Sequence, residues 1–184
     1  MTQNVLVSSS IKEGLPELVS EIAQRGHEVL SFGGSADTLS GAGLTVTDIE
    51  AQYLGVGPDS PWADASALER RAELGRFVLP RLRDDPAVLA ELGNSAIQVA
   101  VISLRNPTLE NPRLDEGGLA YIAAALNGGR LVVTHPDQIG LVCSVLDHPA
   151  RTRSRMQLIY EAEERMQQHT SRWVRAVAAL RGTT

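Results

Sequence analysis

Two turns near the start of the chain carry the residue types that bind phosphate. The first turn, residues 8–12, holds three serines and a lysine and follows a short apolar run. The second turn, residues 31–35, holds two serines and two glycines just before a predicted helix. Lys12 is the only lysine among the 17 lysine and arginine residues of the chain. Hydroxyl groups, backbone N–H groups at a helix start and one ammonium group together suit a phosphate or another small anion.

The residues predicted to contact this anion are those whose hydroxyl, ammonium or backbone N–H group could reach it: Ser8, Ser10, Lys12, Gly33, Gly34 and Ser35. The alternative is that Ser10 and Ser35 cap helices and that Lys12 is solvated, because serine is a common N-cap residue. Two such turns in successive units favour binding. The pattern is neither a P-loop nor a dinucleotide fingerprint, so no nucleotide motif is assigned from it.

Three further residues could act on a ligand held by these turns. Asp115 precedes Glu116 and two glycines, where a carboxylate either caps a helix or orients an amide or hydroxyl group of the ligand. Arg105 follows a predicted central strand, and its guanidinium either grips a carboxamide, polarises a carbonyl group or is simply solvated. His135 follows the last predicted strand and is a candidate general acid or base, or a residue with local hydrogen bonds only.

The composition excludes several classes of function. The net charge is −5 without a basic block, which argues against a nucleic-acid partner. We expect no metal site, because the single Cys143 is predicted in the core and the histidines show no ligand spacing. His27, His148 and His169 are predicted near helix ends or on helix surfaces.

The 184 residues predict a single domain, residues 1–184, with 43% hydrophobic side chains to fill its core. We expect a cytoplasmic protein with no membrane partner, because the sequence shows no signal peptide, no membrane-spanning apolar run and one cysteine only.

Apolar segments alternate with helical patterns, which predicts an α/β fold with a doubly wound, mainly parallel sheet. The predicted strands are residues 5–7, 27–31, 44–49, 97–104 and 131–134. Helices are predicted over residues 15–23, 35–39, 63–82, 86–92, 115–126 and 136–146, with a loop at 53–62. Because ligands of such sheets bind beyond the carboxyl ends of the strands, the candidate residues are expected to meet at that edge.

A long amphipathic helix is predicted at the end of the chain. Its apolar residues recur at steps of three and four, apart from one longer gap, from Met156 to Leu180. Such a helix packs on the body of the protein or on a second copy, so a homodimer is a candidate assembly.

Short motifs along nearly the whole chain occur in an order that resembles the IMP cyclohydrolase domain. That domain is the N-terminal part of a bifunctional purine-biosynthesis enzyme whose C-terminal part is the AICAR transformylase. The motifs are Ser-Ser-Ser-Ile-Lys-Glu-Gly-Leu at 8–15, Ser-Phe-Gly-Gly-Ser-Ala at 31–36, Ala-Gly-Leu-Thr-Val at 42–46, Leu-Asp-Glu-Gly-Gly at 114–118, Ala-Ala-Ala-Leu-Asn at 123–127 and Val-Val-Thr-His-Pro-Asp at 132–137. Methylglyoxal synthase and the allosteric domain of carbamoyl-phosphate synthetase belong to the same superfamily.

The resemblance implies a phosphate-binding, doubly wound fold and a ring closure without a cofactor. The carboxamide nitrogen of a formamidoimidazole carboxamide ribonucleotide attacks the formyl carbon, and water leaves to give IMP. The resemblance assigns phosphate and ribose contacts to Ser8, Ser10, Lys12, Gly33, Gly34 and Ser35. It assigns contacts to the carboxamide and formyl groups to Asp115 and Gly117.

The chain departs from this family where the reaction takes place. Residues 57–75 contain no lysine, although the family carries a catalytic lysine in the corresponding loop. Arg105 replaces a tyrosine, Leu126 a lysine and Phe32 a serine of the family pattern. We therefore expect a divergent enzyme that acts on a related ribonucleotide, with Arg105 and Asp115 facing the reacting group. The alternatives are a non-catalytic nucleotide- or phosphate-binding regulatory module and a lyase on a small phosphate ester.

Overall fold

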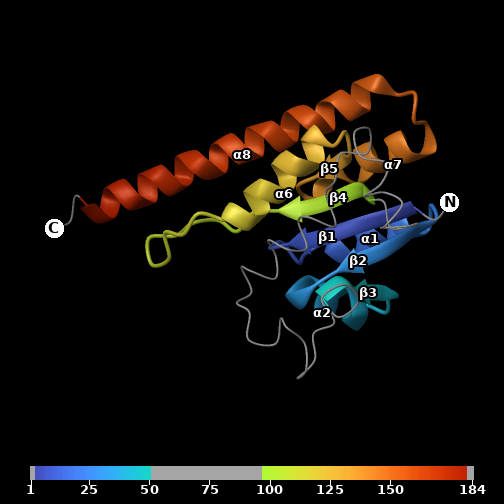
Figure 1. Ribbon diagram of the computed structural model, residues 1–184, viewed down its shortest axis with the longest axis horizontal. Helices are drawn as coiled ribbons and strands as arrows, with labels where there is room; N and C mark the ends of the chain where they lie inside the picture. Colours follow the sequence, from blue (N-terminus) through green and yellow to red (C-terminus); the bar gives the residue numbers. More distant parts are fainter. Residues whose placement is uncertain (1–2, 51–96, 182–184) are drawn as a thin grey trace, which may run out of the picture.

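The computed structural model describes residues 3–50 and 97–181, and these residues form a parallel α/β structure (Figure 1). The predicted loop at 53–62, the helices at 63–82 and 86–92 and the lysine-free stretch at 57–75 lie outside the described residues. The described sheet has five strands in the order β3-β2-β1-β4-β5, and every neighbouring pair is parallel. The strands are β1 (Gln3–Ser9), β2 (His27–Ser31), β3 (Val46–Asp48), β4 (Ile97–Ser103) and β5 (Leu131–Val133).

Successive residues of each central strand face opposite sides of the sheet and build two separate apolar cores. Val5 and Val7 join the core on one side, and Leu6 between them joins the core on the other side. Both faces of the sheet are buried. The sequences of the central strands are therefore continuous apolar runs and do not alternate between polar and apolar residues. The strand register places Ser9 beside Ser103 at the carboxyl ends of β1 and β4.

Helices cover both faces of the sheet. They are α1 (Leu15–Ala23), α2 (Gly33–Gly41), α6 (Glu116–Asn127), α7 (Ile139–Asp147) and α8 (Thr152–Arg181), with a 3₁₀ turn η1 (Pro136–Gln138) before α7. The side chains of α1, α2 and α7 contribute to one core, and those of α6 contribute to the other. The predicted α/β class with a doubly wound parallel sheet is therefore confirmed.

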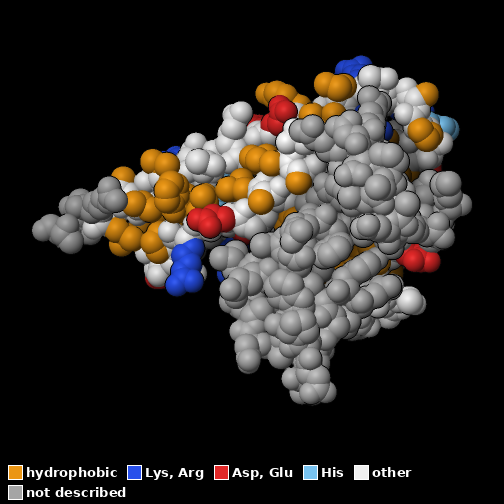
Figure 2. Space-filling view, viewed as in Figure 1, with side chains coloured by type: hydrophobic (Ala, Val, Ile, Leu, Met, Phe, Trp, Pro, Cys, Tyr) orange, Lys and Arg blue, Asp and Glu red, His pale blue; other side chains and the backbone are white. Residues whose placement is uncertain are grey.

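The long C-terminal helix is also confirmed, with 30 residues in α8. It packs against α7 and β5, and Leu158 and Ala162 join the two cores. Its C-terminal half runs past the carboxyl edge of the sheet (Figure 1). Apolar side chains gather at this end of the molecule (Figure 2), where Leu109, Val174 and Leu180 are exposed. The homodimer stays a prediction.

No helix among residues 3–50 and 97–181 is long and apolar enough to cross a membrane.

Candidate functional site

The ends of β1 and β4 and the starts of α2 and α6 surround a cavity of about 610 Å³. Most of the predicted site residues line it together: Ser8, Ser10, Lys12, Gly34, Ser35, Arg105, Asp115 and Gly117. Gly33 and His135 are not among its lining residues. The cavity lies beyond the carboxyl ends of the strands, where ligands of parallel sheets bind, and segments far apart in the sequence meet there.

The first turn is held in place by the hydroxyl group of Ser103, which sequence reasoning missed. Its Oγ accepts hydrogen bonds from the backbone N–H groups of Ser10, at 2.8 Å, and Ile11, at 3.0 Å. The same oxygen lies 2.6 Å from the Oγ of Ser9. Ser103 is buried, so it fixes the path of the turn rather than contacting solvent. A single serine at a strand end gives no local signal for this role.

Lys12 joins the two turns. Its ammonium group donates to the backbone carbonyl oxygen of Ser9 at 2.6 Å and to the Oγ of Ser35 at 3.0 Å. An ammonium group has three donors, so one N–H group remains for a ligand. Burial lowers the pKa of Lys12, and the nearby Asp37 carboxylate partly opposes this shift. Lys12 is exposed, as the alternative of a solvated lysine expected, but its ammonium group also bonds to both turns.

Ser35 positions Lys12 through a saturated hydrogen-bond set. Its Oγ accepts from Lys12 and from the backbone N–H group of Ser9 at 2.9 Å, and it donates to the carbonyl oxygen of Ser9 at 3.2 Å. The alternative that Ser35 caps a helix is wrong, because α2 starts at Gly33 and its N-cap is Phe32. The same alternative is wrong for Ser10, because the N-cap of α1 is Gly14 and the Ser10 hydroxyl group donates to Leu104.

The start of α2 is open toward an anion. Phe32, the N-cap residue, makes no side-chain capping bond to the N–H groups of the first turn. Gly33 has a φ of 54°, in the left-handed region that glycine tolerates, and an added Cβ at Gly33 or Gly34 would meet nothing within 4 Å. Among residues 3–50 and 97–181, nothing lies within 4 Å of these Cβ positions, and a helix start of this kind can bind a phosphate group.

Asp115 caps α6, as its simpler interpretation predicted. Its Oδ1 accepts from the backbone N–H group of Gly118 at 3.0 Å, and its Oδ2 accepts from that of Arg105 at 2.9 Å. The carboxylate therefore ties the start of α6 to the segment that follows β4. Each oxygen keeps a lone pair, and the residue lines the cavity, so a ligand contact is still chemically available.

Glycines 117 and 118 serve different purposes. An added Cβ at Gly118 would lie 2.6 Å from Cδ2 of Leu104 and 3.1 Å from the carboxylate of Asp115, so the packing requires glycine there. An added Cβ at Gly117 would meet nothing within 4 Å. Gly117 therefore leaves space at the cavity wall that any larger residue would fill.

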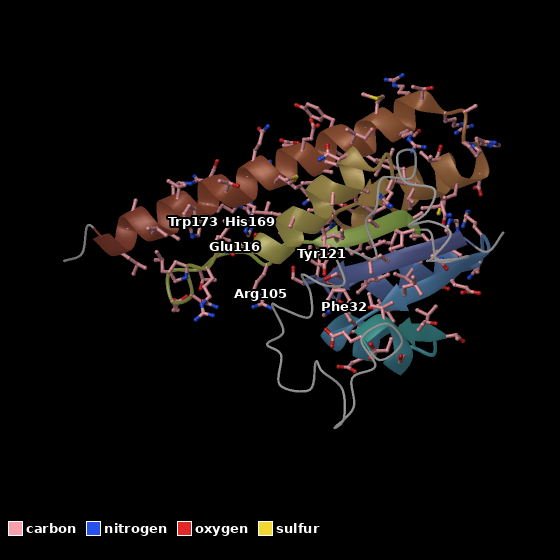
Figure 3. All side chains as sticks on the ribbon, in the orientation of Figure 1. Phe32, Arg105, Glu116, Tyr121, His169 and Trp173 are labelled. Carbon is pink, nitrogen blue, oxygen red and sulfur yellow. The ribbon has the colours of Figure 1, made fainter. Side chains whose placement is uncertain are left out.

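The far end of the cavity carries charged side chains from the segment between β4 and α6. Arg105, Arg113 and Glu116 all line it. Figure 3 shows Arg105 and Glu116 near the start of α6, with Tyr121 and Phe32 further along the same side of the structure. With Lys12 and Asp115, the described lining holds three cationic and two acidic side chains. The balance favours an anionic ligand.

Two aromatic rings form an apolar wall that sequence reasoning also missed. Phe32 and Tyr121 are both 4% exposed, and their ring centroids lie 6.3 Å apart with the planes tilted by 54°. Both line the cavity. Tyr121 lies four residues after Gly117 on α6, and this helical spacing was the available signal.

His135 lies apart from this cavity. It caps η1, and its Nδ1 accepts from the backbone N–H group of Asp137 at 3.3 Å. The same nitrogen lies 2.8 Å from Oδ1 of Asp137. These contacts match the interpretation with local hydrogen bonds only.

Two of the histidines that were predicted near helix ends or on helix surfaces are buried. His169 on α8 is 2% exposed, and its Nε2 accepts from the backbone N–H group of Asp115 at 3.1 Å. His27 at the start of β2 is 5% exposed. Burial lowers the pKa of both imidazoles. Cys143 is half-buried and packs against one core, and burial raises the pKa of its thiol.

Among the residues that the structure describes, no group of three or more His, Cys, Asp or Glu side chains could hold a metal ion.

The fold and the cavity define a parallel α/β protein whose strand-end site combines an open helix start with an ammonium group. No family model matches the chain. It is 32% identical over 167 residues to the bifunctional purine biosynthesis protein PurH of Sorangium cellulosum, an alignment that covers 84% of this chain and 31% of that relative. The chain thus spans about a third of the length of the curated relative it matches.

The crystal structure of ForH has the same fold. It matches with a TM-score of 0.70 and 19% sequence identity, over 96% of this chain and 97% of ForH. The chain is thus PurH-like in sequence and ForH-like in fold. The sequence similarity to a bifunctional purine biosynthesis protein, which the short motifs indicated, is therefore confirmed.

Proposed function

We propose that the chain is a divergent enzyme of the cyclohydrolase type. It closes, or hydrolytically opens, a ring on a formamido-carboxamide ribonucleotide or a related specialised nucleotide. The observation that carries this proposal is the ammonium group of Lys12, which bonds to both turns beside the open start of α2. Similarity to a protein of purine biosynthesis supports a nucleotide as the ligand.

The phosphate group of the nucleotide binds at the α2 end of the cavity. The remaining N–H of Lys12 and the free N–H groups at the start of α2 donate to its oxygens. Ser8 lies at the same end and contacts the phosphate or the ribose. Ser10 contacts the phosphate once its hydroxyl group leaves the carbonyl oxygen of Leu104. Ser35 contributes by holding Lys12 in place.

The reacting groups lie at the α6 end, with the heterocycle against Phe32 and Tyr121. The carboxamide nitrogen forms a bond to the formyl carbon and loses one proton, and the formyl oxygen takes up a proton. The resulting hydroxyl group then leaves with the formamido N–H proton as water, so that atoms and charge balance. Arg105 stabilises the charge that develops on the formyl oxygen, and the N–H group of Gly117 and the carboxylate of Asp115 orient the carboxamide.

The second candidate function is a non-catalytic nucleotide-binding module. One observation favours it: both oxygens of Asp115 already accept backbone N–H groups, as in an ordinary helix cap. In this case the phosphate end would bind a nucleotide and the α6 end would only read its base.

An absorbance assay for purine-ring formation separates the two functions. The enzyme proposal expects turnover of the formamido-carboxamide ribonucleotide, and Arg105→Gln lowers kcat about 10²-fold or more if it removes the group that stabilises the oxygen. Arg153→Gln is the matched control, since Arg153 is an exposed arginine of α8 that does not line the cavity. Tight nucleotide binding without turnover would favour the module, and absence of nucleotide binding would reject both.

A further inference from the structure

The C-terminal half of α8 contacts both ends of the segment between β4 and α6. At the α6 end, Nε2 of His169 accepts from the backbone N–H group of Asp115 at 3.1 Å. At the β4 end, the guanidinium group of Arg172 donates to the side-chain oxygen of Asn106 at 2.8 Å. Asp115 and Arg105, the neighbour of Asn106, both line the cavity of the candidate site. Helix α8 therefore holds a wall of that cavity from behind.

The two contacts differ in their exposure to water. Arg172 and Asn106 are both exposed, so water competes for their hydrogen bond. His169 is only 2% exposed, and a hydrogen bond of a buried group is stronger and more costly to lose. No other described residue accepts from the backbone N–H group of Asp115. The contact of His169 is therefore the one that fixes the segment.

Asp115 passes this constraint on to the α6 end of the cavity. Its N–H group donates to His169, while its Oδ1 accepts from Gly118 and its Oδ2 from the N–H group of Arg105. The three hydrogen bonds join α8, the start of α6 and the segment after β4. Figure 3 shows His169 beside the start of α6. A displacement of Asp115 therefore moves the start of α6 relative to Arg105.

The hydrogen bond requires a neutral imidazole ring. A protonated ring carries an N–H group on each nitrogen, so Nε2 could no longer accept. The charged groups near the ring are the Asp115 carboxylate before α6 and, on α8, Arg165 and Arg172, which line a small cavity with His169. Burial lowers the pKa of His169, Asp115 raises it and Arg172 lowers it, with a net downward shift. The ring that accepts is therefore the form present at neutral pH.

We propose that His169 is a positioning residue for the α6 end of the cavity. Its neutral ring holds the backbone of Asp115, and thereby keeps Asp115 and Arg105 in the arrangement that the reacting groups need. His169 is not among the residues that line this cavity, so it acts through Asp115. The kinetic consequence rests on the function proposed above, whereas the hold of His169 on Asp115 does not.

Two substitutions separate the acceptor from the bulk of the ring. His169→Leu removes the acceptor, and His169→Gln keeps one, because the side-chain oxygen of glutamine reaches about as far as Nε2. Gln167→Leu is the matched control, since Gln167 is an exposed residue of α8 that does not line the cavity.

Hydrogen exchange followed by NMR measures the hold on Asp115 directly. The protection of the Asp115 amide should fall about tenfold or more in His169→Leu and stay near the wild-type value in His169→Gln and Gln167→Leu. Unchanged protection in His169→Leu would overturn the proposal, and so would an equal loss at Val101 in β4, which would show a loss of global stability instead.

The pH dependence of the same amide tests the role of the ring even if His169→Leu does not fold. In the wild-type protein the protection of Asp115 should fall as the pH drops below about 6.5, because the ring then becomes protonated. In His169→Gln it should stay constant, because the glutamine side chain does not titrate. The same pH dependence in both proteins would overturn the proposal.

Turnover of the formamido-carboxamide ribonucleotide gives the kinetic readout. His169→Leu should lower kcat about tenfold or more, and His169→Gln should restore it. The Kd for inorganic phosphate should not change in either variant, because Lys12 bonds to Ser9 and Ser35 at the other end of the cavity. A loss of phosphate affinity with unchanged kcat would contradict the positioning role. Absence of turnover in the wild-type protein would reject the enzyme function alone, and the exchange data would still decide whether His169 holds Asp115.

Discussion

Removing the ammonium group of Lys12 should weaken the binding of phosphate-bearing ligands. Lys12→Met keeps an unbranched apolar stem and deletes the two bonds to Ser9 and Ser35, at 2.6 and 3.0 Å. A hydrogen bond to a charged group contributes about 1.5–3 kcal/mol. Losing one such bond to a bound phosphate corresponds to an increase in Kd of about 10- to 150-fold.

Isothermal titration with IMP and with inosine measures this effect directly. IMP should lose the stated affinity in Lys12→Met, and inosine, which lacks the phosphate group, should bind as weakly to the variant as to the wild-type protein. Glu13→Gln is the matched control, because Glu13 is the exposed neighbour of Lys12 and does not line the cavity. An unchanged Kd for IMP would refute the reasoning, and so would an equal loss for inosine.

A double-mutant cycle tests how Lys12 is positioned. Ser35→Ala removes the hydroxyl group that accepts from the ammonium group. If Ser35 acts through Lys12, its effect on the Kd for IMP should be large in the wild-type background and small in Lys12→Met. Independent, additive effects would show that Ser35 contacts the ligand by itself.

Three further predictions concern stability. Gly33→Ala should lower the unfolding free energy by about 1–2 kcal/mol in urea, because only its left-handed φ of 54° opposes a side chain, whereas Gly34→Ala should show no such loss. Asp115→Ala should cost about 0.5–2 kcal/mol in the same assay, through the lost cap of α6; an unchanged midpoint would contradict that role. Burial lowers the pKa of His27 from 6.5, so the unfolded chain takes up the proton first and the unfolding free energy falls as pH drops below about 6.5. His27→Leu should flatten this slope, and an unchanged slope would contradict the role of His27.

The pattern of apolar residues was enough to predict most of the fold. β2 matches its predicted bounds, and β4 and β5 differ by one residue at their ends, because continuous apolar runs leave few other buried arrangements. β1 extends beyond the predicted 5–7, since polar residues such as Asn4 and Ser9 also pair in the sheet. The order of the strands was not predicted, because β1 pairs with a strand more distant in sequence than its neighbour β2.

The candidate site was predictable in place but not in detail. Because both turns follow strands of a parallel sheet, Lys12 could be predicted to lie near the second turn, but its hydrogen-bond partners could not be predicted. The roles of Ser35 and Ser103 depend on hydrogen bonds between distant segments, which no local pattern encodes. His169 was predicted near a helix end or on a helix surface, yet its Nε2 accepts from the backbone N–H group of Asp115, distant in sequence, and its ring is buried.

The central claim is that the first two turns hold the phosphate group of a nucleotide. A crystal structure of the protein with bound IMP tests it most directly. We predict the phosphate at the start of α2, within hydrogen-bond distance of Nζ of Lys12 and of the N–H group of Gly34, with the base toward Tyr121. A phosphate group bound elsewhere, or an ammonium group turned away from it, would contradict the account.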